Sequence, residues 1–116
     1  MTFDIPLIHK ISDFYKLFHQ HLKLFPKTEK YSLGQKIENL ILEILELCFK
    51  ITCSIKTEKI QLLKDADAKI HLLKNLIRLA YEVKALDNKK YLTLQEQLQE
   101  MGRMIGGWMR YSQNQN

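Results

Sequence analysis

The sequence predicts an all-α protein, specifically an up-down-up-down antiparallel four-helix bundle. Leu, Lys, Glu and Ile dominate its 116 residues, which include only four Gly and two Pro, a composition typical of helices. Apolar residues recur every three or four positions in four successive segments joined by short connections. Short connections place consecutive helices antiparallel. We therefore expect residues 1–112 to form one bundle domain and residues 113–116 a polar tail.

The first helix is predicted over residues 6–25. Asp4 is a suitable N-cap, and Pro6 falls in the first turn, where a missing backbone N–H does no harm. Pro26 disfavours helical geometry at the residue before it, so the helix is expected to end at Phe25. The apolar stripe of this helix consists of Leu7, Ile11, Phe14, Phe18, Leu22 and Phe25.

The second helix is predicted over residues 32–54. Ser32 can cap it, with Gln35 three residues later in the capping-box position. The cap can equally lie at Thr28, which would make Thr28–Tyr31 an extra helical turn. The apolar stripe consists of Leu33, Ile37, Leu40, Ile41, Ile44, Leu47, Cys48 and Ile51.

The third helix, predicted over residues 57–86 with Thr57 as its cap, has an unusually wide apolar arc. A surface helix needs a stripe roughly 100° wide, and the apolar positions here span about twice that width. This helix must therefore be covered on two sides. One stripe holds Leu63, Ala66, Ile70, Leu73, Ile77 and Ala80, and the other holds Leu72, Leu76, Leu79 and Val83.

The fourth helix is predicted over residues 89–111, after a turn and cap at Asp87 and Asn88. Its stripe consists of Tyr91, Leu94, Leu98, Met101, Ile105 and Trp108. The residues from Ser112 onward are polar and are expected to fray.

Glycines occur within two of these helices. Gly34 costs about 1 kcal/mol relative to alanine, and it can allow another backbone to approach closely. Gly102, Gly106 and Gly107 precede Trp108 and together cost about 2 to 3 kcal/mol if all are helical. Close helix–helix contact, a bend that positions Trp108, or local fraying would each account for them.

Apolar residues outside the main stripes predict contacts between subunits. Leu42 and Phe49, seven residues apart, project from the far side of the second helix. A bundle buries one side of each helix, and exposed apolar patches mark interaction surfaces. We expect an oligomer interface that contains Leu42, Phe49, Leu72, Leu76, Leu79 and Val83.

The sequence lacks the spacings that catalysis or metal binding requires. His19 and His21 point in nearly opposite directions on a helix, and no Glu is followed three residues later by His, the pattern of di-iron bundles. His9 and Asp13 can face one metal ion, but this pair is more typical of a solvated helix face. No nucleophile elbow and no phosphate-binding glycine loop occurs. We expect neither an enzyme nor a cofactor; a metal or redox enzyme on a bundle scaffold is the alternative that metal analysis would test.

The chain carries the marks of a cytoplasmic protein. No apolar run approaches the ~20 residues of a membrane span. Asp4, His9 and Lys10 interrupt the N-terminal apolar residues, unlike a signal peptide. Cys48 and Cys53 lie about 140° apart around a helix and do not face each other. We expect both to be buried, reduced thiols.

The net charge of +5 favours acidic partners, above all nucleic acid. Clusters of cations can neutralise phosphates without reading base sequence, and Tyr31 and Tyr111 can stack on bases. Each cluster taken alone is equally compatible with a solvated bundle face. The candidate nucleic-acid-binding residues are Lys27, Lys30, Lys36, Lys64, Lys74, Arg78, Arg103 and Arg110.

Three segments resemble the Avd family, the accessory variability determinants of bacterial diversity-generating retroelements. The wider superfamily includes four-helix-bundle proteins encoded by intervening sequences of ribosomal RNA genes and shares the Phe-Pro-x-x-Glu-x-Tyr-x-Leu pattern, here Phe25 to Leu33. The glycine-rich segment favours the Avd branch. The segments are Ile5-Pro6-Leu7-Ile8-His9-Lys10, Phe25-Pro26-Lys27-Thr28-Glu29-Lys30-Tyr31-Ser32-Leu33-Gly34-Gln35-Lys36-Ile37-Glu38 and Gly102-Arg103-Met104-Ile105-Gly106-Gly107-Trp108.

The resemblance implies a four-helix bundle that forms a basic homopentameric ring, associates with a reverse transcriptase and binds nucleic acid. The complex copies template RNA into mutagenised cDNA, and the accessory protein itself is not an enzyme. The alternative is a structural or protein-interaction bundle of the intervening-sequence type that needs no nucleic acid. Neighbouring genes would distinguish the two, since a reverse transcriptase and imperfect gene repeats favour the first.

Overall fold

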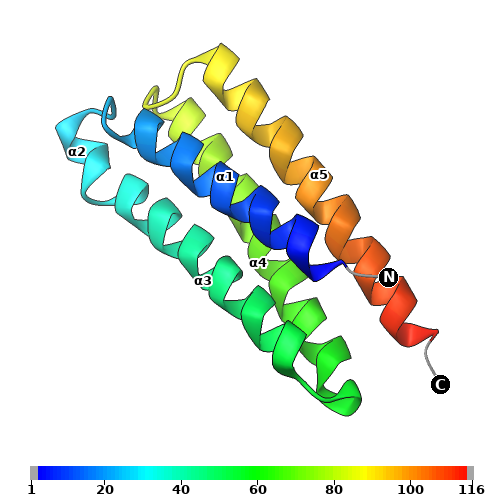
Figure 1. Ribbon diagram of the computed structural model, residues 1–116. Helices are drawn as coiled ribbons and strands as arrows, with labels where there is room; N and C mark the ends of the chain where they lie inside the picture. Colours follow the sequence, from blue (N-terminus) through cyan, green and yellow to red (C-terminus); the bar gives the residue numbers. More distant parts are fainter. Residues whose placement is uncertain (1–2, 115–116) are drawn as a thin grey trace.

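The computed structural model describes residues 3–114, which form helices and turns without any β-strand. Four long helices lie side by side in a bundle, as predicted, and one single-turn helix joins the first two (Figure 1). No helix in the described residues combines the length and the apolar character needed to cross a bilayer. The helices are α1 (Asp4–Leu22), α2 (Lys27–Lys30), α3 (Leu33–Cys53), α4 (Lys56–Glu82) and α5 (Asn88–Gln113).

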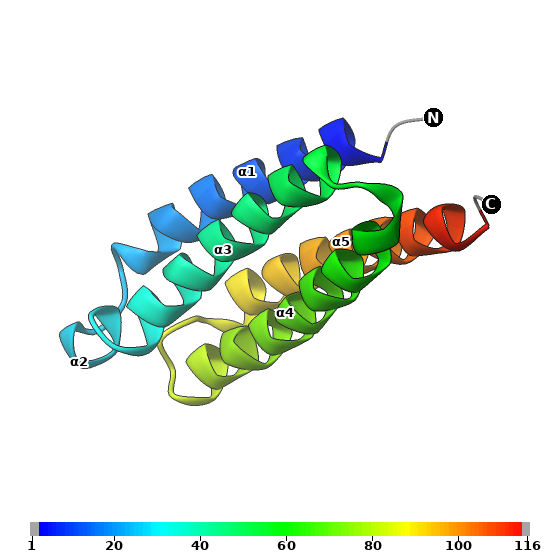
Figure 2. The same cartoon turned by 90° about the horizontal axis from the view of Figure 1, so that it is seen from below.

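The bundle is elongated, with principal extents of 49 × 22 × 19 Å. Around it, α1 packs against α3 and α5, and α4 packs against the other sides of α3 and α5 (Figures 1 and 2). The α2 turn packs on α3 at one end of the bundle. Helices α4 and α5 therefore share one side of the molecule, and this side positions the candidate site.

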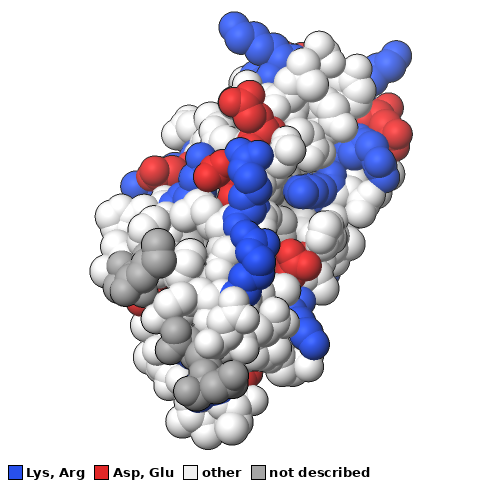
Figure 3. All heavy atoms as spheres, turned by 90° about the vertical axis from the view of Figure 1, so that its right-hand side faces the viewer, with Lys and Arg blue, Asp and Glu red and all other residues white. Residues whose placement is uncertain are grey.

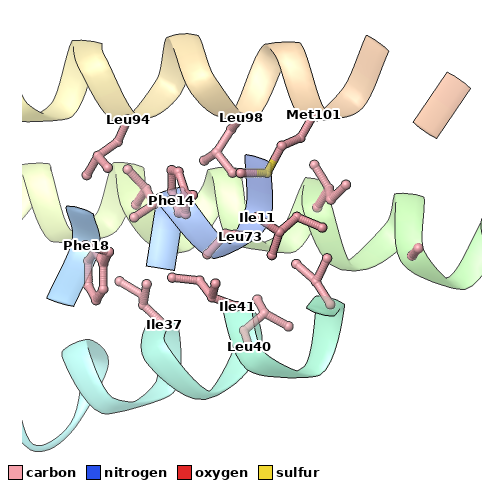
Figure 4. Packing of buried hydrophobic residues seen from close by; sticks show 14 of the residues in the cluster. Ile11, Phe14, Phe18, Ile37, Leu40, Ile41, Leu73, Leu94, Leu98 and Met101 are labelled. Atoms are coloured by element: carbon pink, nitrogen blue, oxygen red, sulfur yellow. The ribbon is translucent and has the colours of Figure 1, made fainter. Parts of the chain in front are cut away.

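The predicted stripes meet in one hydrophobic core, which runs between the four long helices (Figure 4). Phe14 and Phe18 of α1 are fully buried among aliphatic side chains from α3, α4 and α5. Leu33 and Tyr91 are only partly buried, because each lies near the end of its helix. Within the described residues no polar or charged side chain is buried, so the candidate functional residues lie on the surface and not in the core.

The structure corrects the bounds of α1, which runs from Asp4 to Leu22 rather than over residues 6–25. Asp4 lies inside the helix, and Phe3 occupies the N-cap position without a side-chain hydrogen bond. After Leu22 the backbone tightens, and the N–H of Phe25 donates to the carbonyl of Leu22 (3.1 Å). Phe25 is still buried because its ring meets that of Phe18 edge-on at 5.7 Å. The apolar stripe therefore extends beyond the end of α1, with Phe25 buried from the turn that follows the helix.

The capping box at Ser32 does not form. The Ser32 hydroxyl donates backwards to the carbonyl of Thr28 (2.9 Å), and Gln35 donates to Asn39 (3.4 Å). The extra turn expected near residues 28–31 exists as α2, one residue earlier, with Pro26 rather than Thr28 in its N-cap position. α3 then begins at Leu33.

Gly34 explains how α2 and α3 fit together. A Cβ at this position would lie 2.4 Å from Cδ1 of Leu22, 3.1 Å from the carbonyl oxygen of Glu29 and 3.2 Å from Cδ2 of Phe25. The backbone that approaches is therefore the α2 turn, which the sequence alone did not identify. Any side chain here would push the turn away from the bundle.

α4 ends at Glu82, four residues before the predicted end, and Thr57 is its second residue rather than its cap. Lys84 takes the left-handed conformation (φ 67°), its N–H donates to Tyr81, and the N–H of Ala85 donates to the carbonyl of Ala80 (2.8 Å). This is the Schellman arrangement, which usually has glycine where Lys84 stands. The absence of glycine concealed this helix end.

The cap of α5 is confirmed, because Oδ1 of Asp87 accepts from the N–H of Lys90 (2.8 Å). The helix continues to Gln113, so Ser112 is helical rather than frayed. The predicted polar tail begins inside the helix, and its last two positions, 115 and 116, lie outside the described residues.

Candidate nucleic-acid interface

The cations predicted on α4 lie along its α5-facing edge. The side-chain amide of Gln95 on α5 donates to the carbonyl of Lys74 (3.0 Å), which marks this edge. Arg78 follows Lys74 by four residues, and Lys64 precedes Lys74 by ten. Helical periodicity therefore places all three on the side of α4 that is nearer to α5. Lys64 and Arg78 are exposed, and Lys74 is half-buried.

The two predicted cations of α5, Arg103 and Arg110, are both exposed and seven residues apart. The Nζ of Lys74 lies 3.7 Å from a Cβ placed on Gly102, next to Arg103. Lys74 therefore reaches α5 beside Gly102, and the cations of the two helices share one side of the molecule, while Arg103 also lines a hollow with Lys10 of α1 and Glu100. We call Lys64, Lys74, Arg78, Arg103 and Arg110 the basic side.

The glycines of α5 belong to the basic side and not to a helix–helix contact. A Cβ at Gly106 would meet only Nη1 of Arg110, at 3.5 Å, and one at Gly107 would meet the ring of Phe3 and Nη2 of Arg110. Within residues 3–114, no backbone of another helix lies within 4 Å of a Cβ at these positions, and α5 is helical throughout them. Close helix packing and fraying are therefore both wrong as explanations. The missing side chains leave room for the cationic groups to lie against the helix.

Carboxylates within residues 3–114 engage few of these cations. Glu100 pairs with Arg103, and Asp67 pairs with His71 at 3.5 Å. Lys64, Lys74, Arg78 and Arg110 form no ion pair within that part of the chain, although Arg78 donates to Asn75. Figure 3 views the side of the molecule on which α5 lies and shows a column of Lys and Arg side chains along its middle. Such a column suits the evenly spaced phosphates of a nucleic-acid backbone.

Lys27, Lys30 and Lys36 form a separate group at the α2 end of the bundle. Lys27 and Lys30 belong to α2, and the Nζ of Lys30 lies 5.9 Å from the centre of the Tyr31 ring. Lys36 precedes Glu43 by seven residues and so shares its α4-facing edge of α3. The structure therefore does not bring these three lysines onto the basic side.

Lys56 and Lys59 are cations that the sequence reasoning missed. Both belong to the first turn of α4 and line a cavity with Trp108 and Tyr111 of α5. Their spacing of three residues was a usable signal, since it places them on one face of a helix.

The predicted interface residues fall into two groups. The first, which we call the α3 strip, contains the predicted residues Leu42 (42% exposed) and Phe49 (54% exposed), together with the half-buried Leu45, which was not among the predicted interface residues. Hydrogen bonds from His19 to Glu38 (2.9 Å) and from Thr52 to Asp4 (3.5 Å) mark the α1-facing edge of α3. Leu42 follows Glu38 by four residues and Phe49 precedes Thr52 by three, so this strip lies along that edge.

The second group, the α4 strip, consists of Leu72, Leu76, Leu79 and Val83. Leu72, Leu79 and Val83 are 44 to 47% exposed, whereas Leu76 packs partly against the core. Lys69 bonds to Glu43 of α3 at 3.1 Å, and Leu72 and Leu76 follow Lys69 by three and seven residues, so this strip faces α3. The exposed polar residues Asn39 and Glu46 of α3 lie between the two strips. The predicted interface is therefore two surfaces.

The histidines and cysteines are the remaining side chains that the sequence raised as candidates for metal binding or redox chemistry. The described residues contain no group of three or more His, Cys, Asp or Glu side chains placed to hold a metal ion, and His9 and Asp13 are both exposed. Burial, and secondarily Lys90, lowers the pKa of His21 against an opposing effect of Asp87, so His21 adds no charge near neutral pH. Burial raises the pKa of the Cys48 thiol to about 12. Cys53 is exposed, which corrects the expectation that both thiols are buried.

The fold and the basic side define a helical-bundle protein with a net charge of +5. The model of the bAvd-like family matches residues 7–112, nearly the whole chain. The chain therefore belongs to the bAvd-like family, as the three sequence segments predicted. No curated protein matches the chain.

Proposed function

We propose that this protein is a non-catalytic, oligomeric accessory protein of a diversity-generating retroelement. It binds RNA, DNA or an RNA–DNA hybrid and partners a reverse transcriptase in the mutagenic copying of template RNA. Its membership of the bAvd-like family supports this proposal, because the Avd proteins that the sequence resembles serve such retroelements. The polymerase performs the chemistry, and the bundle positions nucleic acid in the cytoplasm.

The convergence of cations from α4 and α5 is the observation that carries the proposal. Lys74 and Arg78 reach the same side of the molecule as Arg103 and Arg110, and three of these four have no carboxylate partner within residues 3–114. Unpaired cations in a row attract phosphates and release the counterions that surround a nucleic acid. Binding should therefore be salt-dependent and largely independent of sequence.

Reversing two of these charges tests the role of the basic side. The Lys74→Glu/Arg78→Glu variant should bind template RNA at least about tenfold more weakly, and two lost phosphate contacts should reduce the slope of log K against log salt by about 1.4 to 1.8. Lys16→Glu/Lys23→Glu, an exposed lysine of α1 and the exposed lysine at its C-cap, is the matched control with the same change in net charge. Filter binding at several salt concentrations measures both quantities. If the test variant and the control lose equal affinity and slope, the basic side does not have this role.

The two apolar strips support self-association, which the proposal takes to be a homopentameric ring. A ring requires two different, mutually complementary surfaces on each subunit, and the α3 and α4 strips are two such separate surfaces. Changing Leu42 and Phe49 together to Lys should shift the assembly to monomers in native mass spectrometry, with and without structured RNA. The control changes Leu24 and Leu92 to Lys, and it should leave the mass unchanged because both residues are exposed outside the two strips. An unchanged mass would remove the α3 strip from the interface.

The helix order is also part of this proposal, in which residues 1–112 form one up-down-up-down bundle. Two residues, Ser54 and Ile55, separate α3 from α4, and five separate α4 from α5, which supports antiparallel neighbours. An oligomer that binds no nucleic acid, encoded within a ribosomal RNA gene, would favour the structural bundle of the intervening-sequence type instead. A neighbouring reverse-transcriptase gene with imperfect repeats would favour the retroelement.

A further inference from the structure

A cavity of about 230 Å³ lies between the beginning of α4 and the end of α5. Its lining is Lys56 and Lys59 from the first turn of α4, and Trp108, Tyr111 and Ser112 from the last turns of α5. It combines two ammonium groups with two aromatic rings and a hydroxyl. None of these five residues belongs to the basic side or to the apolar strips.

The two lysines carry positive charges that no carboxylate within residues 3–114 pairs with. Lys56 is exposed, and Lys59 is half-buried. Like charges three residues apart repel each other, and the first turn of a helix is itself positive. An anion that bridged Lys56 and Lys59 would relieve this repulsion.

The aromatic residues specify what else the anion carries. Trp108 is held in the core with 6% of its surface exposed, whereas Tyr111 is 39% exposed. The ring of Phe3 lies 5.5 Å from that of Tyr111 and supports it. Among the described residues, only Lys30 and Tyr31 form a cation–π contact, so neither lysine of the cavity covers these rings. A planar ring can therefore pack against Tyr111 while its anionic group reaches the lysines.

We propose that this cavity binds one nucleotide, with the phosphate between Lys56 and Lys59 and the base against Tyr111 beside Trp108. Its volume of about 230 Å³ lies below the ~300 to 1,000 Å³ of pockets that enclose a drug-sized ligand, so the cavity would hold the phosphate and one face of the base while the rest of the nucleotide stays in solvent. The nucleotide is either free or the end of a nucleic-acid strand. The second case rests on the proposed function. In that case the protein would bind the strand along the basic side and its end in this separate cavity.

The single tryptophan provides a direct reporter of binding. Because Trp108 is the only Trp of the chain, the ¹H–¹⁵N spectrum has one indole N–H signal, and it reports on the cavity. Nucleoside monophosphates should shift this signal saturably, whereas the same nucleosides and inorganic phosphate should each bind at least about tenfold more weakly, since each makes half of the contacts. Equal responses to inorganic phosphate and to the nucleotide would overturn the assignment, since the cavity would then bind any anion.

Two variants test the assigned contacts. Lys56→Ala/Lys59→Ala should raise the Kd for a nucleoside monophosphate by at least about tenfold, because charge-assisted hydrogen bonds are the strong ones. The control Lys16→Ala/Lys89→Ala removes the same charge elsewhere and should leave the Kd unchanged. Tyr111→Leu should weaken nucleotide binding and leave phosphate binding unchanged. Equal Kd values for the test variant and the control would overturn the proposal.

The two sources of the nucleotide are separated by a six-nucleotide single strand with a terminal phosphate. Binding at least about tenfold tighter than the monophosphate, with this gain lost in Lys56→Ala/Lys59→Ala, assigns the cavity to a strand end. A gain that survives in this variant comes from the basic side and leaves the cavity to a free nucleotide. Filter binding of long RNA to Lys56→Ala/Lys59→Ala keeps this inference apart from the proposed function. If the unaltered protein binds RNA but its Trp108 signal does not respond to nucleotides, the proposed nucleotide site is wrong and the proposed function stands. If the unaltered protein does not bind RNA, the proposed function is wrong.

Discussion

Replacing Gly34 with alanine tests whether the α2 turn is held against α3 by close backbone contact. Alanine improves intrinsic helix propensity by about 1 kcal/mol in α3. The new Cβ, however, would lie 2.4 Å from the tip of Leu22 and 3.1 Å from the carbonyl oxygen of Glu29. Leu22 is 8% exposed and has little room to turn. The carbonyl of Glu29 accepts from the N–H of Ser32 (3.3 Å), so it can move only with the turn.

Gly102→Ala is the matched comparison on α5. Its Cβ would meet only the flexible end of Lys74, at the ordinary contact distance of 3.7 Å. The propensity gain is then undiminished, and this variant should be about 1 kcal/mol more stable than the unaltered protein. Both variants make the same chemical change inside a helix. Gly34 is the second residue of α3, whereas Gly102 lies in the interior of α5, so the difference between the variants combines the steric cost at Gly34 with a smaller propensity gain there.

Overpacking a buried position costs about 1 to 3 kcal/mol, so Gly34→Ala should be less stable than Gly102→Ala by that amount. Urea unfolding followed by circular dichroism measures it, at one protein concentration because self-association raises apparent stability. If the two variants agree within about 0.5 kcal/mol, the contact between α2 and α3 does not restrict this position. Equal gains from both substitutions would refute the reasoning most directly.

Three further predictions concern single residues. Lys84→Gly should stabilise the protein by about 0.5 to 1 kcal/mol, because glycine takes the left-handed conformation at the end of α4 without strain. The control Lys16→Gly, inside α1, should destabilise the protein by about 1 kcal/mol. Thermal or urea unfolding measures both changes. Cys53 should react with iodoacetamide at pH 8, and Cys48 only after unfolding, as peptide mass spectrometry would reveal. Because burial raises the pKa of Cys48 from 9.0 to about 12, its contribution to stability should be complete below pH 9 and lost as the pH rises from there towards 12. Equal labelling of both thiols in the folded protein would contradict the burial of Cys48.

The sequence determined the helices and their buried faces. A helix that buries one side must repeat its apolar residues every three or four positions, and this local rule identified nearly all the core residues of α1, α3, α4 and α5. It also identified exposed cations and apolar residues, because whatever falls outside the stripe faces outward. The cap at Asp87 followed in the same way, since the capping bond joins residues only three apart.

The tertiary structure decided where the helices end and which residues meet. Phe25 is buried in the core although it lies in a turn, and α4 ends with Lys84, not glycine, in the left-handed conformation. In both places the packing of the whole bundle outweighs the local preferences that mark helix ends. The basic side depends on α4 and α5 being neighbours, and the cavity between the beginning of α4 and the end of α5 joins Lys59 to Trp108 across 49 positions of the chain. Such pairings arise only when the helices have packed, since periodicity fixes the direction of a side chain on its own helix and says nothing about the helix beside it.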